Sequence, residues 1–260
     1  MEKKKKKYKM KNKKAFTLAE ILITLVIIGV VASLTISNAI HNSHRTQNIT
    51  KYRKFYSELT QAYDVYLVTN NVSDFSSYNV NPNLGTGMIN FIRNNFKTNP
   101  PSTQIHSSIN GYYTKSGYGG KDNPQIRGLD GTPFWLWRQQ AIVLNNGIEI
   151  SVSCNHPHWV HKIENGQSVG VYKCSLWVDV NGEMRGPNIL GEDIFSLLLL
   201  NDGVHAWPLP LDLYPKDGYY IPVLDGNTNN STLEKYRHCT KNSTGAACSG
   251  WFLNYNGYER

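Results

Sequence analysis

The apolar run over residues 16–36 constrains this chain more than any other feature of the sequence. It holds 21 positions, and Glu20 is the one charged residue among them. As an α-helix rising about 1.5 Å per residue, the run reaches roughly 30 Å, which matches the hydrocarbon core of a bilayer. The sequence therefore predicts a helix that can cross a membrane, and it raises the question of why a carboxylate lies inside it.

Two interpretations of Glu20 follow from the residues alone. The carboxylate lies near one end of the run, so its side chain can reach toward the polar interface. The free-energy cost of placing the charge in the membrane is then lower than for a charge at the centre of a span, which costs about 2.5–3.5 kcal/mol. The alternative is a positive partner for the carboxylate, such as the free amino terminus of another chain.

The flanks of the run differ from those of an ordinary secretory signal. Such a signal has an apolar core of roughly 7–15 residues followed by a small-residue cleavage site. Here the run is longer and no A-x-A pattern ends it, while the small residue Ala15 precedes it. Cleavage next to Ala15 would therefore leave the apolar helix on the product.

The string KKAFTLAE, which ends at Glu20, resembles the prepilin signal of type IV pilins and type II secretion pseudopilins. The resemblance implies cleavage between Ala15 and Phe16 by a prepilin peptidase, followed by N-methylation of Phe16. It also implies that Glu20 pairs with the amino terminus of a neighbouring subunit during assembly. The family usually has glycine before the cut, where this chain has Ala15.

The positive charge of the chain is concentrated before the apolar run. Residues 1–15 hold nine lysines and one glutamate, and eighteen basic and eighteen acidic residues remain from residue 16 onward. The positive-inside rule places residues 1–15 in the cytoplasm as a leader peptide and the rest of the chain outside. Because the mature chain is near neutral, we expect no nucleic-acid partner.

The helical pattern continues beyond the membrane-spanning run. Apolar and aromatic residues recur at spacings of three and four, which is typical of one face of an amphipathic helix. We therefore expect one helix over residues 16–69, with a membrane and assembly part (16–36) and an amphipathic continuation (37–69) that packs against a globular head (70–260). The residues of this predicted seam are Tyr52, Phe55, Tyr56, Leu59, Tyr63, Tyr66 and Leu67.

The predicted head is a small antiparallel β-sheet. Residues 70–133 show weak periodicity and are expected to form loops with at most one strand. The segments 141–144 and 148–153 flank an Asn-Gly pair and predict a hairpin, and a later strand ends at a second Asn-Gly pair, Asn181-Gly182. The chain is thus predicted to be an α+β protein of pilin-like layout, with a long N-terminal helix against a small sheet.

Four cysteines lie in the predicted head, at positions 154, 174, 239 and 248. An even number in an exported domain indicates disulfides, and four cysteines allow three connectivities. We favour Cys154–Cys174 and Cys239–Cys248, because both loops are short. The alternative for the first cysteine is a zinc site in CNHPHWVH, made of Cys154, His156, His158 and His161.

A second signature covers WVDVNGEMRGPNILGEDIFSLLL and resembles a segment common in the heads of pseudopilin-type proteins. Its Asn-Gly and Pro-Asn pairs are turn formers. A calcium site is a more specific hypothesis than turn formation alone, because Asp179, Asn181, Glu183 and Asp193 offer oxygen ligands. The spacing of these residues does not match that of an EF-hand. No other cofactor is expected. The residues that carry the resemblance are Asp179, Asn181, Gly182, Pro187, Asn188, Gly191, Asp193 and Phe195.

The sequence therefore predicts a structural subunit rather than an enzyme, since none of the common catalytic motifs is present. The resemblance implies a pilin or pseudopilin that resides in the bacterial inner membrane and then in a periplasmic or surface filament. Its implied partners are other such subunits, prepilin peptidase, the inner-membrane assembly platform and the lipid bilayer. The alternatives are a minor pilin that serves adhesion or DNA uptake, and a membrane-anchored exported hydrolase.

Overall fold

The structure of the chain is a computed structural model that forms two compact units, Met1–His44 and Arg45–Arg260. Each unit is described by itself. The residues that the structure describes are 16–72, 85–98, 126–134, 140–154, 161–164, 167–170, 174–182, 185–200, 203–206, 219–220, 238–255 and 257–258.

The first unit contains the apolar half of helix α1, which runs over Leu18–Asn70. Large apolar side chains between Phe16 and Ile40 keep 46–81% of their surface exposed. In the part of the chain that the structure describes, α1 is the one helix long and apolar enough to cross a membrane, with a mean hydropathy of 2.4 over its best window. The predicted long N-terminal helix is thus confirmed.

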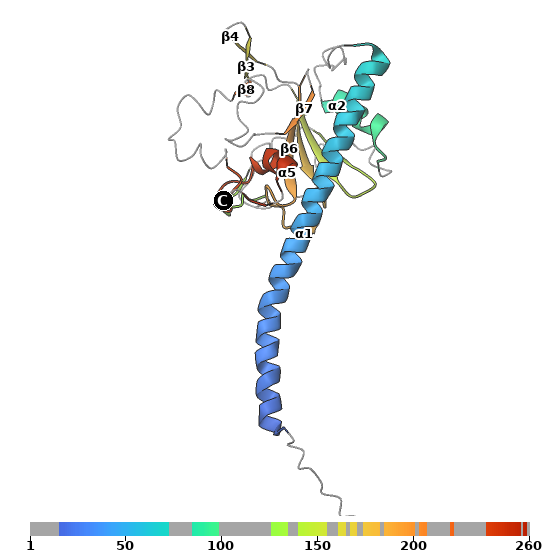
Figure 1. Cartoon of the computed structure of the whole chain (residues 1–260). Coiled ribbons are helices and arrows are strands. Elements are labelled where there is room, and N and C mark those ends of the chain that lie inside the picture. The colour runs from blue at the N-terminus through green and yellow to red at the C-terminus, as the bar shows by residue number, and fades with distance from the viewer. Residues whose placement is uncertain are drawn as a thin grey trace, which may run out of the picture. The chain divides into compact units, whose positions relative to one another are not determined.

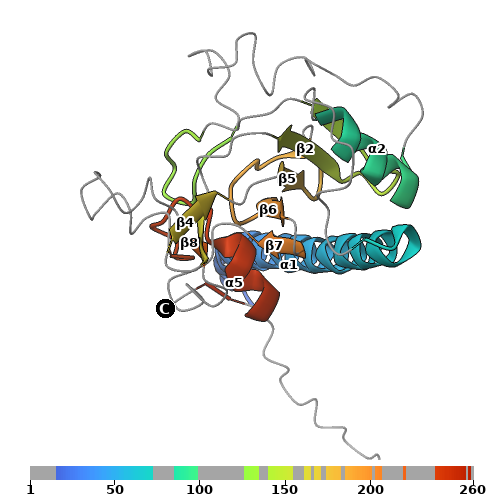
Figure 2. The same cartoon turned by 90° about the horizontal axis from the view of Figure 1, so that it is seen from above.

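The second unit is built on a five-stranded antiparallel sheet in the order β1-β2-β5-β6-β7. Figure 1 shows strands β6 and β7 of this sheet beside the second half of α1. Helix α2 covers the β1–β2 end, and helix α5 lies beside β6 and β7 (Figure 2). The strands are β1 (Gln140–Val143), β2 (Glu149–Cys154), β5 (Cys174–Asp179), β6 (Ile194–Leu200) and β7 (Gly203–Ala206). The helices are α2 (Gly85–Asn95) and α5 (Cys248–Asn254), and a separate three-stranded sheet pairs β4 (Gln167–Gly170), β3 (His161–Glu164) and β8 (Tyr219–Tyr220).

The predicted hairpin is present as β1 and β2. Leu144 N–H donates to Ile148 O over 2.8 Å, and the loop between these residues holds three residues. Gly147 has φ +84°, in the left-handed region that glycine adopts without a steric cost. The Asn-Gly pair therefore ends the hairpin loop with its glycine, and the asparagine side chain accepts the N–H of Ile148 over 3.1 Å.

The second half of α1 packs its aromatic face into the main core of the head. Tyr52, Phe55, Leu59 and Tyr63 are at most 2% exposed, as the spacing predicts. The ring of Tyr52 stacks on that of Phe195 in β6 with 4.2 Å between centroids. The remaining seam residues, Tyr56, Tyr66 and Leu67, are partly buried against the same core.

Strand β6 is an interior strand, and side chains on both of its faces are buried. Phe195, Leu197 and Leu199 belong to the core that contains α1. Ile194 alternates to the other face and joins a smaller cluster with Ile126 and Leu190. The run FSLLLL is thus a central strand, and this burial explains why its sequence lacks polar alternation.

The expectation of loops throughout residues 70–133 is wrong, since α2 lies within that range. Met88, Ile89, Phe91 and Ile92 are almost fully buried, and their spacing is helical. The surrounding glycines and asparagines obscured this pattern, because both residue types favour turns over helices. Tertiary burial of one apolar face outweighs the weak helix propensity of the segment.

Leu59→Ala should destabilise the head by about 2–5 kcal/mol, because Leu59 is fully buried and the substitution leaves a cavity. Val68→Ala, on the same helix at a site that is 82% exposed, should change stability by less than about 0.5 kcal/mol. Denaturant unfolding of the full chain in detergent, followed by tryptophan fluorescence, measures both variants. Equal midpoints for Leu59→Ala and the unmodified chain would show that this face of α1 is not packed.

Candidate functional site

Thr17 and Glu20 form a capping box at the start of α1. The N–H and hydroxyl of Thr17 donate to Glu20 Oε2 over 2.8 and 2.9 Å, and the N–H of Glu20 donates to Thr17 Oγ1 over 3.2 Å. Such a box satisfies N–H groups that the first turn of a helix leaves without intrahelical partners. Glu20 therefore has a local structural role that is independent of any other chain.

The capping box was missed at the level of sequence, although its signal is present. The pattern Thr-x-x-Glu directly before an apolar run is the signature of this motif. Both hydrogen bonds that the carboxylate accepts go to Oε2 of Glu20, so the box leaves Oε1 out of its contacts. Glu20 can hence cap its own helix and keep one carboxylate oxygen for a second donor.

The predicted cleavage position lies directly before this box. Phe16 is 81% exposed and adjoins Thr17, while Ala15 lies outside the described residues. A new amino terminus at Phe16 would stand one residue before the capping threonine. Processing at this bond would therefore bring a positive amine close to the carboxylate of Glu20 and leave the box intact.

The second signature folds into two adjoining turns that its own acidic side chains hold. Asp179 Oδ1 accepts the N–H groups of Asn181 and Gly182 over 3.1 and 2.8 Å. Gly182 has φ +82°, and a Cβ on it would lie 2.9 Å from Gly147 O. The Asn181-Gly182 turn is thus closed by Asp179 and packed against the β1–β2 loop.

Asp193 holds the next turn with both carboxylate oxygens. Its Oδ2 accepts the N–H of Asn188 over 2.8 Å, and its Oδ1 accepts the N–H of Ile189 over 2.7 Å. Asn188 has φ 60°, a backbone conformation that asparagine tolerates better than most residues. The amide of Asn181 donates to Asp193 Oδ2 over 3.3 Å and thereby links the two turns.

The two aspartates are fully buried, at 1% and 0% exposure. Burial and the nearby charges of Asp193 and Glu149 together raise the pKa of Asp179 to about 7, and its two backbone hydrogen bonds oppose the shift. Burial also raises the pKa of Asp193, against the N–H groups of Asn188 and Ile189. Asp179 thus gains a proton near neutral pH, while its Oδ1 stays bound to the turn.

The carboxylate oxygens that the calcium hypothesis invokes are used within the turns. Asp179 Oδ1 and both oxygens of Asp193 accept hydrogen bonds within the turns, and Glu183 lies outside the described residues. Among the described residues, no group of three or more His, Cys, Asp or Glu side chains could hold a metal ion. For the zinc alternative, His156 and His158 also lie outside the described residues.

Two disulfides are present in the head, Cys154–Cys174 and Cys239–Cys248. The first joins direct register partners of β2 and β5. The second lies against the signature turn, because a Cβ on Gly191 would come within 2.9 Å of Cys248 Sγ. Gly191 is therefore required both for its φ of +78° and for the close approach of this disulfide.

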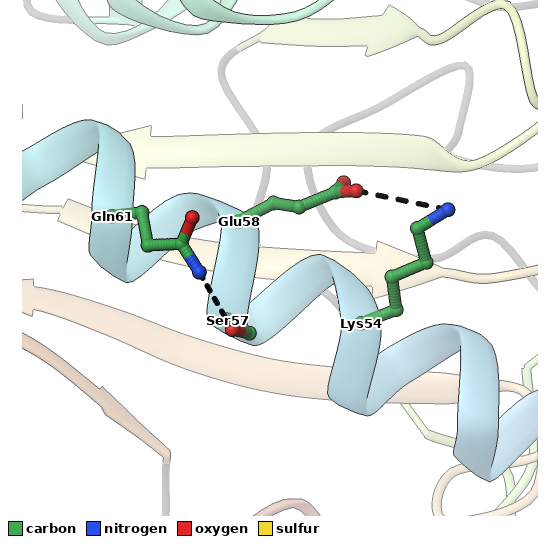
Figure 3. Close-up of polar contacts among 4 residues, drawn as sticks. All are labelled: Lys54, Ser57, Glu58 and Gln61. Carbon is green, nitrogen blue, oxygen red and sulfur yellow. Dashed lines mark hydrogen bonds and ion pairs between the residues drawn. The ribbon is translucent and has the colours of Figure 1, made fainter.

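A hollow of about 530 Å³ lies between α1, the end of α2 and the β1–β2 loop. Its carboxylate, Glu58, is 3.8 Å from Lys54 Nζ, and the amide of Gln61 donates to Ser57 over 3.1 Å (Figure 3). The lining thus combines an ion-paired acid and amides with apolar side chains. The lining residues are Glu58, Gln61, Ala62, Val65, Asn95, Phe96, Lys97, Leu144, Asn145 and Asn146.

Comparison with known protein families identifies the N-terminal segment. Residues 10–36 match the family described as the prokaryotic N-terminal methylation motif. The chain carries a prepilin-type signal. The match includes the Ala15–Phe16 bond and Glu20, and such a signal is the one that type IV pilins and pseudopilins carry. Comparisons with curated proteins and with solved structures gave no significant match.

Asp179→Asn should flatten the pH dependence of the head's stability. The raised pKa means that the folded chain binds this proton more tightly than the unfolded chain, so stability is lost as pH rises from about 4 to about 7. The asparagine keeps an oxygen for the N–H groups of Asn181 and Gly182. Melting temperatures at pH 5 and pH 8 should therefore differ less for Asp179→Asn than for the unmodified chain.

Asp193→Asn is the matched control, and its expected result is a loss of stability that does not depend on the titration of Asp179. Both oxygens of Asp193 accept N–H groups, so an amide would turn its own N–H₂ toward a donor. This variant should be destabilised at both pH values, on the order of 1–3 kcal/mol. An unchanged pH dependence in Asp179→Asn would contradict the assignment of the titration to Asp179.

Proposed function

We propose that the chain is a structural subunit, a pilin or pseudopilin, that prepilin peptidase processes and that assembles through its N-terminal helix. The observation that carries the proposal is the methylation motif over residues 10–36, at the start of an exposed apolar helix. The peptidase cuts between Ala15 and Phe16 and methylates the new amino terminus of Phe16. The head of the subunit is then the part presented outside the membrane.

Assembly depends on the exposed surface of the first half of α1. Its large apolar side chains are mostly exposed, so lipid or neighbouring helices must cover them. Before assembly the lipid bilayer of the inner membrane does so, and in the filament the equivalent helices of other subunits replace it. An inner-membrane assembly platform brings the subunits together.

Glu20 gives this assembly a direction and a register. Pairing its free Oε1 with the amine of Phe16 on a neighbour removes one unpaired charge of each sign from a nonpolar setting. The capping box holds the carboxylate at a defined place on the first turn of the helix. The ion pair therefore requires one fixed axial offset between neighbouring subunits.

The mature protein is expected to begin with N-methylated Phe16. Amino-terminal mass spectrometry on protein from a host with an active prepilin peptidase measures this directly. Ala15→Gly, which restores the residue usual in the family, should increase the processed fraction and serves as the positive control. Recovery of an intact leader from both proteins would contradict processing at this bond.

Glu20→Gln should lower filament incorporation while leaving the membrane-inserted pool and leader removal unchanged. Glutamine can still form a capping box, so the variant removes the charge and keeps the cap. Loss of one partner of a buried ion pair costs about 3–5 kcal/mol, because the other charge is left unpaired. Sheared filaments and membranes are quantified by immunoblot, in cells without the unmodified subunit.

Two matched variants separate the roles of Glu20. Glu58→Gln removes an exposed carboxylate from the same helix and should incorporate normally, because its ion pair with Lys54 is solvent-exposed. Thr17→Ala removes the cap and leaves the charge. Normal incorporation of Glu20→Gln together with a defect in Thr17→Ala would show that Glu20 acts through the cap and not through a pair between subunits.

A further inference from the structure

The C-terminal strap, defined here as residues 248–255 and 257–258, binds the second half of α1 through two arginines. Arg53 donates its Nε–H to Phe252 O and an Nη2–H to Tyr255 O, the latter over 2.7 Å. Such bonds from a guanidinium to backbone carbonyls depend on the path of the strap rather than on its side chains. Arg53 therefore binds the backbone of the strap and not its side chains.

Arg45 makes the second contact, eight residues earlier on the same helix. Its guanidinium lies over the ring of Tyr258, 3.9 Å from the centroid, and 5.6 Å from that of Phe252. The hydroxyl of Tyr258 donates to Glu192 Oε1 over 3.3 Å. Burial and the charge of Glu192 raise the pKa of Tyr258, so the phenol remains a donor to the signature turn.

Ser249 connects α1, the strap and the sheet at one residue. The hydroxyl of Tyr52 donates to Ser249 O over 2.8 Å, and the N–H of Ser196 in β6 donates to Ser249 Oγ over 2.7 Å. The ring of Phe252 lies edge-on to that of Phe195, which in turn stacks on Tyr52. The strap thus completes the core where α1 meets β6.

The strap has little intrinsic order. Helix α5 has seven residues, one of them glycine, and its N-cap residue Ala247 makes no side-chain cap bond. A helix of this length is not stable alone in water. The strap therefore depends on its tertiary contacts and on the covalent bond at its first residue, Cys248.

The Cys239–Cys248 disulfide anchors this first residue. Both cysteines are fully buried, and the turn that they enclose binds the segment before β1. Leu129 N–H donates to Thr244 O over 3.3 Å, and Asp130 N–H donates to Ser243 O over 2.9 Å. The disulfide thus joins the strap to a turn that is already fixed to the head.

The other disulfide serves as an internal contrast. Cys154 and Cys174 are register partners on adjacent strands, and the hydrogen bonds of β2 and β5 already hold them together. Loss of the Cys154–Cys174 disulfide therefore removes a link that the strand pairing duplicates. Loss of Cys239–Cys248 removes a link that no strand pairing in the described part of the head duplicates.

We propose that Cys239–Cys248 is a redox latch: its formation docks the C-terminal strap on α1, and its reduction releases the strap while the five-stranded sheet stays folded. On closure, two thiols lose two electrons and two protons to a disulfide-bearing oxidant, which becomes two thiols. The head is then completed only in an oxidising compartment. This inference goes beyond assembly, because it concerns when the head gains its full contact with α1.

Hydrogen exchange of the full chain in detergent tests the latch. In a Cys239→Ser/Cys248→Ser variant, amides of residues 248–255 should exchange at least about tenfold faster, and those of residues 49–56 should also lose protection. Amides of β5 and β6 should remain protected. The matched Cys154→Ser/Cys174→Ser variant should leave the strap as protected as in the unmodified chain.

Reduction of the purified, oxidised chain provides a second measurement that does not require the variant to fold from the start. Addition of a phosphine reductant should release the strap before the sheet loses protection. An unchanged strap, once thiol alkylation shows that Cys239 and Cys248 are reduced, would overturn the proposal. Simultaneous loss of protection in the strap and in β5 and β6 would also overturn it, because the disulfide would then hold the whole head.

Discussion

The head depends on one buried contact, the stacking of Tyr52 in α1 on Phe195 in β6. The ring of Tyr52 brings apolar area into the core, while its hydroxyl reaches Ser249 O and so needs no water. Three elements far apart in sequence therefore meet at this side chain. A helix whose other half is exposed and apolar obtains its hold on the head from this region.

The signature segment supports that contact at the start of β6. Asp193 closes the turn directly before the strand, and Phe195 follows two residues later. Asp179 and Asn181 tie this turn to the end of β5. The acidic residues of the signature thus act within the fold, since they bind backbone N–H groups that the turns would otherwise leave buried and unsatisfied.

Several features could be predicted from residue patterns because local physics determines them. The length and apolarity of residues 16–36, the aromatic spacing of the second half of α1 and the Asn146-Gly147 hairpin each depend on a short segment. The Thr17–Glu20 capping box belongs to the same class, since its whole signal lies in four residues.

Other features depend on contacts between distant segments. Helix α2 contains residues of weak helix propensity and forms because its apolar face is buried. Strand β6 lacks the alternation of polar and apolar residues because both of its faces are covered. Arg45, Arg53 and the strap carry no sequence motif. The sequence by itself determined the membrane-spanning length of α1, its cap and its aromatic face, because helix geometry converts spacing into direction. Only the tertiary structure decided that the strap binds α1, because those bonds join residues about two hundred positions apart. It also decided that the signature acids are buried in their turns, since that burial depends on the packing of the sheet.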